Sequence, residues 1–204
     1  CIRDRGGAIS NVVGSVRGRQ IGYKSILVDT LDASVSWDGT QLVVPYMNGN
    51  WSRGTFTGSG RLGNGTFGLS LYGTHIGLEQ FNGWSPKPLG GTVSMEANLQ
   101  GSLENPTGTV TIAGNTLSYG VTQFDRMFVK ANIEDKKLHI LEGDLEYKKS
   151  IYDVRGTINL DGDQDVDIKG SAKDVRIEDI LPNFTDIPMT GWIHTDVHIE
   201  GTLQ

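Results

Sequence analysis

The sequence predicts an all-β protein, made of two tandem repeat units with roughly five or six antiparallel strands each. Three observations lead to this prediction. Apolar and polar residues alternate with a period of two, short turn sequences separate the alternating segments, and the second half of the chain repeats the first. Short links join antiparallel neighbours, because parallel strands need a crossover of about a dozen residues or more.

The repeat has a spacing close to one hundred residues. Val44 corresponds to Ile140 at an offset of 96, and Gly91 corresponds to Gly191 at an offset of 100. The residues that the copies share are glycines and alternating aliphatics rather than polar catalytic types, as expected of a unit repeated for its shape. We expect a first unit at residues 1–104 and a second at 105–204, in one continuous domain that is a fragment of a longer chain.

Half-buried strands are predicted wherever the alternation is clear. In the stretch 92–101, for example, every second residue from Val93 to Leu99 is apolar and the residues between them are polar. The first unit contains predicted strands at 32–37, 41–47, 55–62, 67–72 and 92–101. The second contains predicted strands at 128–133, 137–142, 151–160, 165–170 and 192–201.

The links between these strands carry the residues that tight turns require, such as Asp38-Gly39, Gly63-Asn64-Gly65 and Glu134-Asp135. Two segments at matching places, 76–81 and 175–181, break the alternation and run into loops that contain proline. We expect one helical turn in the second segment and no helix elsewhere.

The composition narrows the possible classes of function. Glycine makes up 28 of 204 residues, about twice its usual share of roughly 7%, which fits many turns and bulges. The formal net charge of −6 argues against a nucleic-acid partner. Only one cysteine is present, so no intrachain disulfide can form, and no apolar run approaches the roughly 18 residues of a membrane-spanning helix.

Two groups of polar residues resemble metal ligands. Carboxylates alternate from Asp161 to Asp167 as at the start of a calcium loop, but Val166 stands where the glycine of the sharp turn belongs. Between His194 and Glu200 four polar residues share one strand face, and ligands spaced along a single strand diverge rather than converge. No nucleophile motif or phosphate loop accompanies them, so we expect no enzyme, no metal and no cofactor.

A sheet with one apolar face must close into a barrel, fold against another sheet, wind as a helix, or curl around a groove. Glycines inside the predicted strands, such as Gly58, Gly60 and Gly156, permit sharp curvature. Aromatic residues make up only 8% of the chain, which favours a tightly curled sheet over a wide filled core. A dry β-sandwich core, in which the same residues pack on each other, is the alternative that periodicity alone leaves open.

An ordered series of segments resembles the C-terminal repeat region of the TamB family, the translocation and assembly module proteins related to AsmA-like bridge proteins. The series covers nearly the whole chain and consists of degenerate pieces. They are residues 101–120 (GSLENPTGTVTIAGNTLSYG), 124–140 (FDRMFVKANIEDKKLHI), 154–162 (VRGTINLDG) and 173–203 (KDVRIEDILPNF…MTGWI…IEGTL).

The resemblance implies a β-taco, a curled sheet whose concave side is a hydrophobic groove. It also implies a periplasmic location, as part of an inner-membrane-anchored protein of a diderm bacterium that meets an Omp85-type outer-membrane barrel. The implied function is the carriage of phospholipid between the membranes. The groove is expected to be lined by Val93, Met95, Ala97, Leu99, Val129, Ala131, Ile133, Leu138, Ile140, Ile158, Leu160, Val166, Ile168, Ile193, Val197 and Ile199.

Two other functions remain open at this stage. A chaperone-like assembly factor for outer-membrane or autotransporter barrels would use the same residues and add client strands to its open sheet edges. A β-solenoid or sandwich surface module, such as a carbohydrate-active enzyme, is disfavoured because a repeat near one hundred residues is too long for one solenoid coil.

Overall fold

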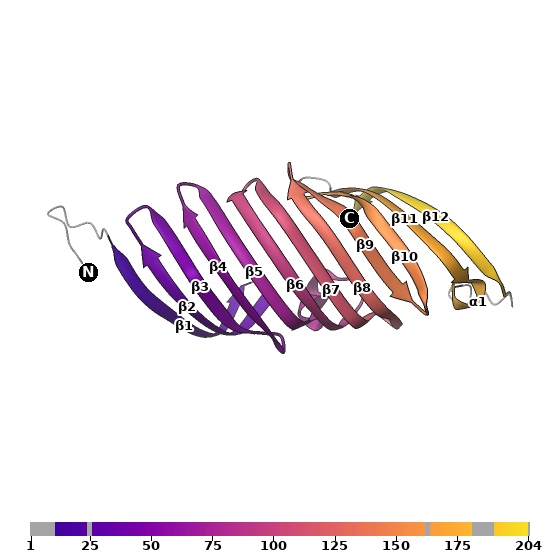
Figure 1. Ribbon diagram of the computed structural model, residues 1–204, viewed down its shortest axis with the longest axis horizontal. Helices are drawn as coiled ribbons and strands as arrows, with labels where there is room; N and C mark the ends of the chain where they lie inside the picture. The colour runs from indigo at the N-terminus through magenta and orange to yellow at the C-terminus, as the bar shows by residue number, and fades with distance from the viewer. Residues whose placement is uncertain (1–10, 24–25, 162–163, 181–189, 204) are drawn as a thin grey trace.

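The computed structural model describes residues 11–23, 26–161, 164–180 and 190–203. These residues form one twelve-stranded antiparallel sheet in which every strand pairs with its neighbours in sequence (Figure 1). The strands are β1 (Val12–Tyr23), β2 (Ile26–Trp37), β3 (Gln41–Trp51), β4 (Gly54–Gly63), β5 (Thr66–Gly77), β6 (Leu89–Ser102), β7 (Pro106–Tyr119), β8 (Thr122–Glu134), β9 (Lys137–Tyr147), β10 (Ser150–Asn159), β11 (Gln164–Arg176) and β12 (Trp192–Leu203).

The strands are bent and stacked side by side along the long axis of the molecule, with β1 and β12 at opposite ends (Figure 1). The all-β prediction is confirmed, and the curled sheet is consistent with a taco-like fold. The sheet does not close into a barrel, since β1 pairs with β2 and β12 pairs with β11. The sandwich alternative is wrong for the described residues, because they form no second sheet.

The two units bend the backbone at equivalent places. His75 in β5 and Asp174 in β11 stand 99 residues apart and have positive φ angles of 56° and 54°. Each lies in a bulge that shifts the pairing register, at 73–76 in one strand and 172–175 in the other. A bulge bends its strand and increases its local twist, so the repeat in sequence corresponds to a repeat in curvature.

Cross-strand pairing gives the sheet two chemically distinct faces, because residues directly opposite one another point the same way. One face, named here the aliphatic face, is exemplified by the row Leu69, Leu99, Gly108, Ile133, Leu138, Ile158 and Val166. The other, named here the polar face, is exemplified by the row Ser70, Asn98, Thr109, Asn132, His139, Thr157, Asp167 and Glu200.

The alternation did not predict β1 or β7 as strands. In both strands glycines occupy aliphatic-face positions and interrupt the alternation, as Gly18 does opposite Leu31 and Gly108 opposite Leu99. A Cβ atom at Gly108 would lie 1.9 Å from the carbonyl oxygen of Asn98, so a side chain is sterically excluded where the adjacent strands approach closely. The missing apolar residue therefore reflects packing between strands and not the end of a strand.

Two short helical segments interrupt the sheet. The predicted turn in the second unit is present as α1 (Ile177–Ile180), but the expectation of no other helix is wrong, because the first unit contains the 3₁₀ helix η1 (Leu78–Trp84) at the matching place. Since η1 has no side-chain N-cap, tertiary contacts rather than local signals hold it. Within the described part of the chain, no helix has the length and apolar character needed to span a membrane.

Candidate functional site

The predicted groove residues lie together on the aliphatic face, with the exception of Leu160. Pairing places Ala97 beside Val110 and Val110 beside Ala131, and the same row continues through Ile140 to β10. Leu160 follows the end of β10, donates its backbone N–H to the carbonyl of Lys136 at 2.8 Å and is exposed. The other predicted residues thus form adjoining rows that extend across β6 to β12, apart from β7, where the sequence analysis selected no residue.

The aliphatic face also contains residues that the sequence analysis did not select. Val44, Met47, Leu69 and Leu71 continue the rows into β3 and β5, and Ile112 fills the gap on β7. The alternation in the predicted strands 41–47 and 67–72 already contained the signal for Val44, Leu69 and Leu71, whereas Met47 reaches this face only through the register shift between Val44 and Met47. Ile112 was missed together with its strand.

The exposure of alanine side chains indicates which face of the sheet lies inside the curl. Because the alanine side chain is a single methyl group, its exposure depends mainly on how closely the neighbouring side chains crowd around it. Ala97, Ala131 and Ala172 on the aliphatic face are only 5%, 3% and 2% exposed, although this region of the sheet is a single layer. Ala113, which pairs with Ser94 on the polar face, is more accessible. Since side chains converge on the inside of a bent sheet and spread on the outside, the aliphatic face lies inside the curl.

The interior is covered unequally along the sheet. Most of the predicted lining residues between β6 and β11 are half-buried, and Val93, Ala97, Ala131 and Val166 are buried. On β12 exposure rises to 37–54% for the predicted lining residues Ile193, Val197 and Ile199. The inner surface is therefore partly accessible in the middle strands and most accessible at β12, which has only one neighbouring strand among the described residues.

One region of the aliphatic face is sealed by η1. Ile76, Val93 and Leu117 form a buried cluster, and Trp51, Leu78, Phe81, Ile112, Phe124 and Met127 pack against it. Trp51 and Phe81 meet edge to face, with ring centroids 5.7 Å apart. This cluster resembles a small conventional core, and it closes the interior locally.

Polar contacts hold η1 across the interior. Gln80 donates to the carbonyl oxygen of Leu27 at 3.0 Å, and its Oε1 accepts from Nε1 of Trp51 at 2.7 Å. Arg53 in the β3–β4 turn forms an ion pair with Glu79, and this hydrogen bond holds the pKa of Glu79 below its ordinary value. The helix therefore links β2, β3 and the β3–β4 turn, and acts as a cross-brace.

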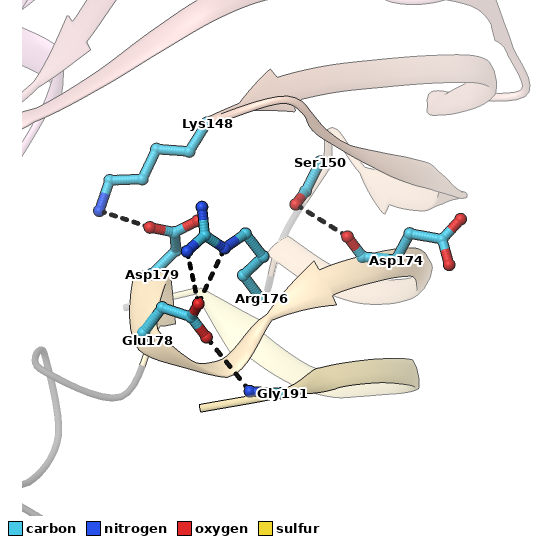
Figure 2. Close-up of polar contacts among 7 residues, drawn as sticks. All are labelled: Lys148, Ser150, Asp174, Arg176, Glu178, Asp179 and Gly191. Atoms are coloured by element: carbon cyan, nitrogen blue, oxygen red, sulfur yellow. Dashed lines mark hydrogen bonds and ion pairs between the residues drawn. The ribbon is translucent and has the colours of Figure 1, made fainter. Parts of the chain in front are cut away.

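The second unit has a corresponding brace, shown in Figure 2. Lys148 in the β9–β10 turn pairs with Asp179 of α1 at 3.2 Å, and Glu178 accepts from Arg176 and from the backbone N–H of Gly191. Val175 beside this helix is fully buried. The helix η1 follows β5 and α1 follows β11, and in an antiparallel meander all odd-numbered strands end at the same rim of the sheet. Both braces therefore lie at one rim, and tight turns such as those after β2 and β4 lie at the opposite rim.

The polar face contains shallow hollows. One of about 620 Å³ lies over β3 to β7, where Arg61, Ser70 and Asn98 contribute to its walls. Another of about 470 Å³ lies over β10 to β12 beside Arg155 and Lys169. The sequence predicted an apolar functional surface, and these polar-face positions were not among the predicted site residues.

The structure also forms a cluster of possible metal ligands that the sequence analysis did not anticipate. Nε2 of His198 lies 2.8 Å from a carboxylate oxygen of Asp167 and 3.2 Å from one of Glu200. The expectation that ligands along the single strand β12 diverge did not consider the neighbouring strand β11, which contributes Asp167. These exposed groups could hold a divalent ion, but a proton on His198 shared with the two carboxylates satisfies the same geometry. Residues 162–163 of the calcium-like sequence lie outside the described residues.

A second acidic contact lies farther along the same face. Asp144 on β9 and Asp153 on β10 stand directly opposite one another. Partial burial, followed by the interaction with Asp153, raises the pKa of Asp144 above its ordinary value. The sheet thus places two like charges side by side, which destabilises a cross-strand pair.

Comparison with protein-family models, curated proteins and solved structures found no match for this chain.

Proposed function

We propose that the aliphatic face is a groove that carries the acyl chains of phospholipid, in a segment of a periplasm-spanning bridge protein. The observation that carries the proposal is that, within the described residues, a single sheet has an aliphatic inner face that no second sheet covers and that η1 seals only around Ile76, Val93 and Leu117. Twelve strands have eleven spacings of roughly 4.8 Å, which give a groove of about 53 Å. The periplasmic setting and an Omp85-type barrel partner follow from the resemblance to the TamB family.

The lining chemistry supports transport rather than tight storage. The rows consist mainly of Val, Ile, Leu, Met, Ala and Gly, which offer an acyl chain contact without hydrogen bonds of fixed direction. Each methylene transferred from water to such a surface gains roughly 0.8 kcal/mol. Because neighbouring rows offer similar contacts, a bound chain can move from one strand to the next at little cost, while its headgroup stays in water.

The braces suggest a direction of access. Both η1 and α1 occupy the rim formed by the connections after odd-numbered strands. Acyl chains therefore enter from the opposite rim, where turns such as Asp38-Gly39 and Asn64-Gly65 are short.

The test is acyl binding by the folded chain and its variants, with cis-parinaric acid as the fluorescent probe and mass spectrometry of copurified lipid. Leu99→Asp and Ile168→Asp place a charge on the aliphatic face and are expected to weaken probe binding at least about tenfold, which corresponds to about 1.4 kcal/mol. The matched controls Gln100→Asp and Lys169→Asp lie next to them on the polar face and are expected to bind normally. Circular dichroism verifies the fold of each variant.

The lipid proposal fails if the folded Leu99→Asp and Ile168→Asp variants retain probe affinity and copurified phospholipid. In that case these residues act as core and not as a conduit.

A second candidate, a chaperone for unfolded barrel strands, is favoured by one observation. Among the described residues, no strand pairs with the outer edge of β1 or of β12, so each edge could accept an added strand. Copurification of peptide in place of phospholipid would favour this function over lipid carriage.

A further inference from the structure

A histidine and two carboxylates converge on the polar face between β11 and β12. Nε2 of His198 lies 2.8 Å from a carboxylate oxygen of Asp167 and 3.2 Å from one of Glu200. One ligand atom of each side chain lies within 4.8 Å of the other two. His198 and Glu200 belong to β12 and Asp167 belongs to β11, so the three atoms meet from two strands and do not spread along one.

The separations match those between neighbouring ligands of a zinc ion. Zinc binds imidazole nitrogen at about 2.0–2.1 Å and carboxylate oxygen at about 2.0–2.2 Å, so neighbouring ligand atoms lie roughly 2.9–3.5 Å apart in four- and five-coordinate sites. The two distances from Nε2 of His198 span nearly the same range. Imidazole together with carboxylate suits zinc, whereas calcium and magnesium prefer oxygen ligands alone.

The charges around this cluster also favour a cation. Asp167 and Glu200 stand directly opposite one another, and like charges in that arrangement destabilise a cross-strand pair. Lys169 follows two residues after Asp167 on β11, but among the described residues no lysine or arginine forms an ion pair with either carboxylate. A divalent cation between the two carboxylates would replace their repulsion with attraction to a shared charge.

The repeat shows that the fold does not require these three side chains. At offsets of 99 and 100 residues, the matching positions of the first unit hold Gly68, Asn98 and Gln100. Gly68 pairs with Gln100 just as Asp167 pairs with Glu200. Because an uncharged set forms the same strand pairing, the histidine and the carboxylates of the second unit need an explanation other than the shape of the sheet.

We propose that Asp167, His198 and Glu200 bind one zinc ion, with water completing its coordination. The imidazole supplies Nε2 without its proton, and each carboxylate supplies one oxygen. The ion then joins β11 to β12 and stabilises their pairing. Zinc here departs from the sequence-based expectation of no metal, which considered β12 alone. The site lies on the polar face, so it is independent of lipid binding by the aliphatic face.

Competition for zinc against a chromophoric indicator tests the site, in a tag-free chain that carries Cys1→Ser so that no thiol contributes. One zinc ion per chain is expected to bind. His198→Asn and Glu200→Gln should each weaken binding at least about tenfold, because changes even to residues that only orient a ligand typically cost that much. Both variants carry the residue of the first unit, so the sheet should form, and circular dichroism verifies it. The matched controls His194→Asn and Asp196→Asn, on the same strand, should bind normally.

Imidazole NMR identifies the ligand directly. Zinc should shift the ring resonances of His198 and leave those of His75, His139 and His194 in place. The site is overturned if the unaltered chain binds no zinc, in which case His198 shares a proton with the carboxylates. It is also overturned if folded His198→Asn binds zinc as tightly as the unaltered chain, or if the shift appears only at another histidine.

Discussion

Ile76 offers the sharpest test of the brace formed by η1. Its side chain is fully buried against Val93 and Leu117, at the place where the interior of an otherwise open sheet is sealed. Replacement by alanine removes three carbon groups that no solvent reaches. If η1 is a structural brace and not a loosely attached loop, the surrounding residues cannot move in to fill the space.

The expected loss follows from burial. Three carbon groups at roughly 0.8 kcal/mol each give about 2.4 kcal/mol of transfer free energy, and the remaining cavity brings the total for Ile76→Ala to about 2–5 kcal/mol. Ile151→Ala removes the same groups from a side chain that is 48% exposed, so its loss should be near half of the transfer term, about 1 kcal/mol. Ile76→Val should lie between wild type and Ile76→Ala, with a loss of about 0.5–1.5 kcal/mol.

The assay is equilibrium unfolding in urea, followed by circular dichroism for strand content and by the combined fluorescence of the four tryptophans, which include Trp51. Coincident transitions would show that the sheet unfolds as one unit, which an elongated repeat need not do. If Ile76→Ala loses no more stability than Ile151→Ala, the cluster is not a rigid core and the brace argument is wrong.

Three further predictions concern other features of the sheet. Gly108→Ala should destabilise by more than about 1 kcal/mol, because Gly108 has a φ of 144° and a Cβ would meet a backbone oxygen; Gly14→Ala, where nothing lies within 4 Å, should be near neutral in the same urea assay. Gln80→Ala should cost about 1–3 kcal/mol through its lost hydrogen bonds. It should also speed exchange of the Leu27 amide, whose N–H donates to Oε1 of Gln80 at 3.3 Å, and unchanged exchange would contradict the brace. Asp153→Asn should stabilise by about 0.2–1 kcal/mol at pH 7. The folded-state pKa of Asp144 exceeds its ordinary value of 3.8, so protonation of Asp144 favours the folded chain below pH 3.8, and this contribution is lost as the pH rises through the raised pKa. The gain in stability from Asp153→Asn should therefore disappear on acidification. A gain that persists at low pH would refute a charge effect.

The sequence by itself determined what depends on local pattern. A period of two along a strand decides which side chains share a face, so the alternation from Val93 to Leu99 placed four residues on the aliphatic face before any neighbour was known. Turn residues such as Asp38-Gly39 marked the hairpin ends, and the offset between Val44 and Ile140 revealed the repeat. Strands β1 and β7 were not predicted, because glycines interrupt the alternation in both; in β7 the glycines Gly108 and Gly114 leave room for the neighbouring strand β6.

Only the tertiary structure decided the features that depend on contacts between segments far apart in the sequence. Whether an antiparallel meander closes or remains open depends on twist and bulges accumulated over twelve strands, and no local pattern specifies that sum. The packing of η1 over Trp51 depends on contacts between residues far apart in the chain, and so does the approach of Asp167 to His198. The alternation therefore predicted an apolar face, and the fold determined that this face stays largely uncovered, because an open single sheet supplies no second layer.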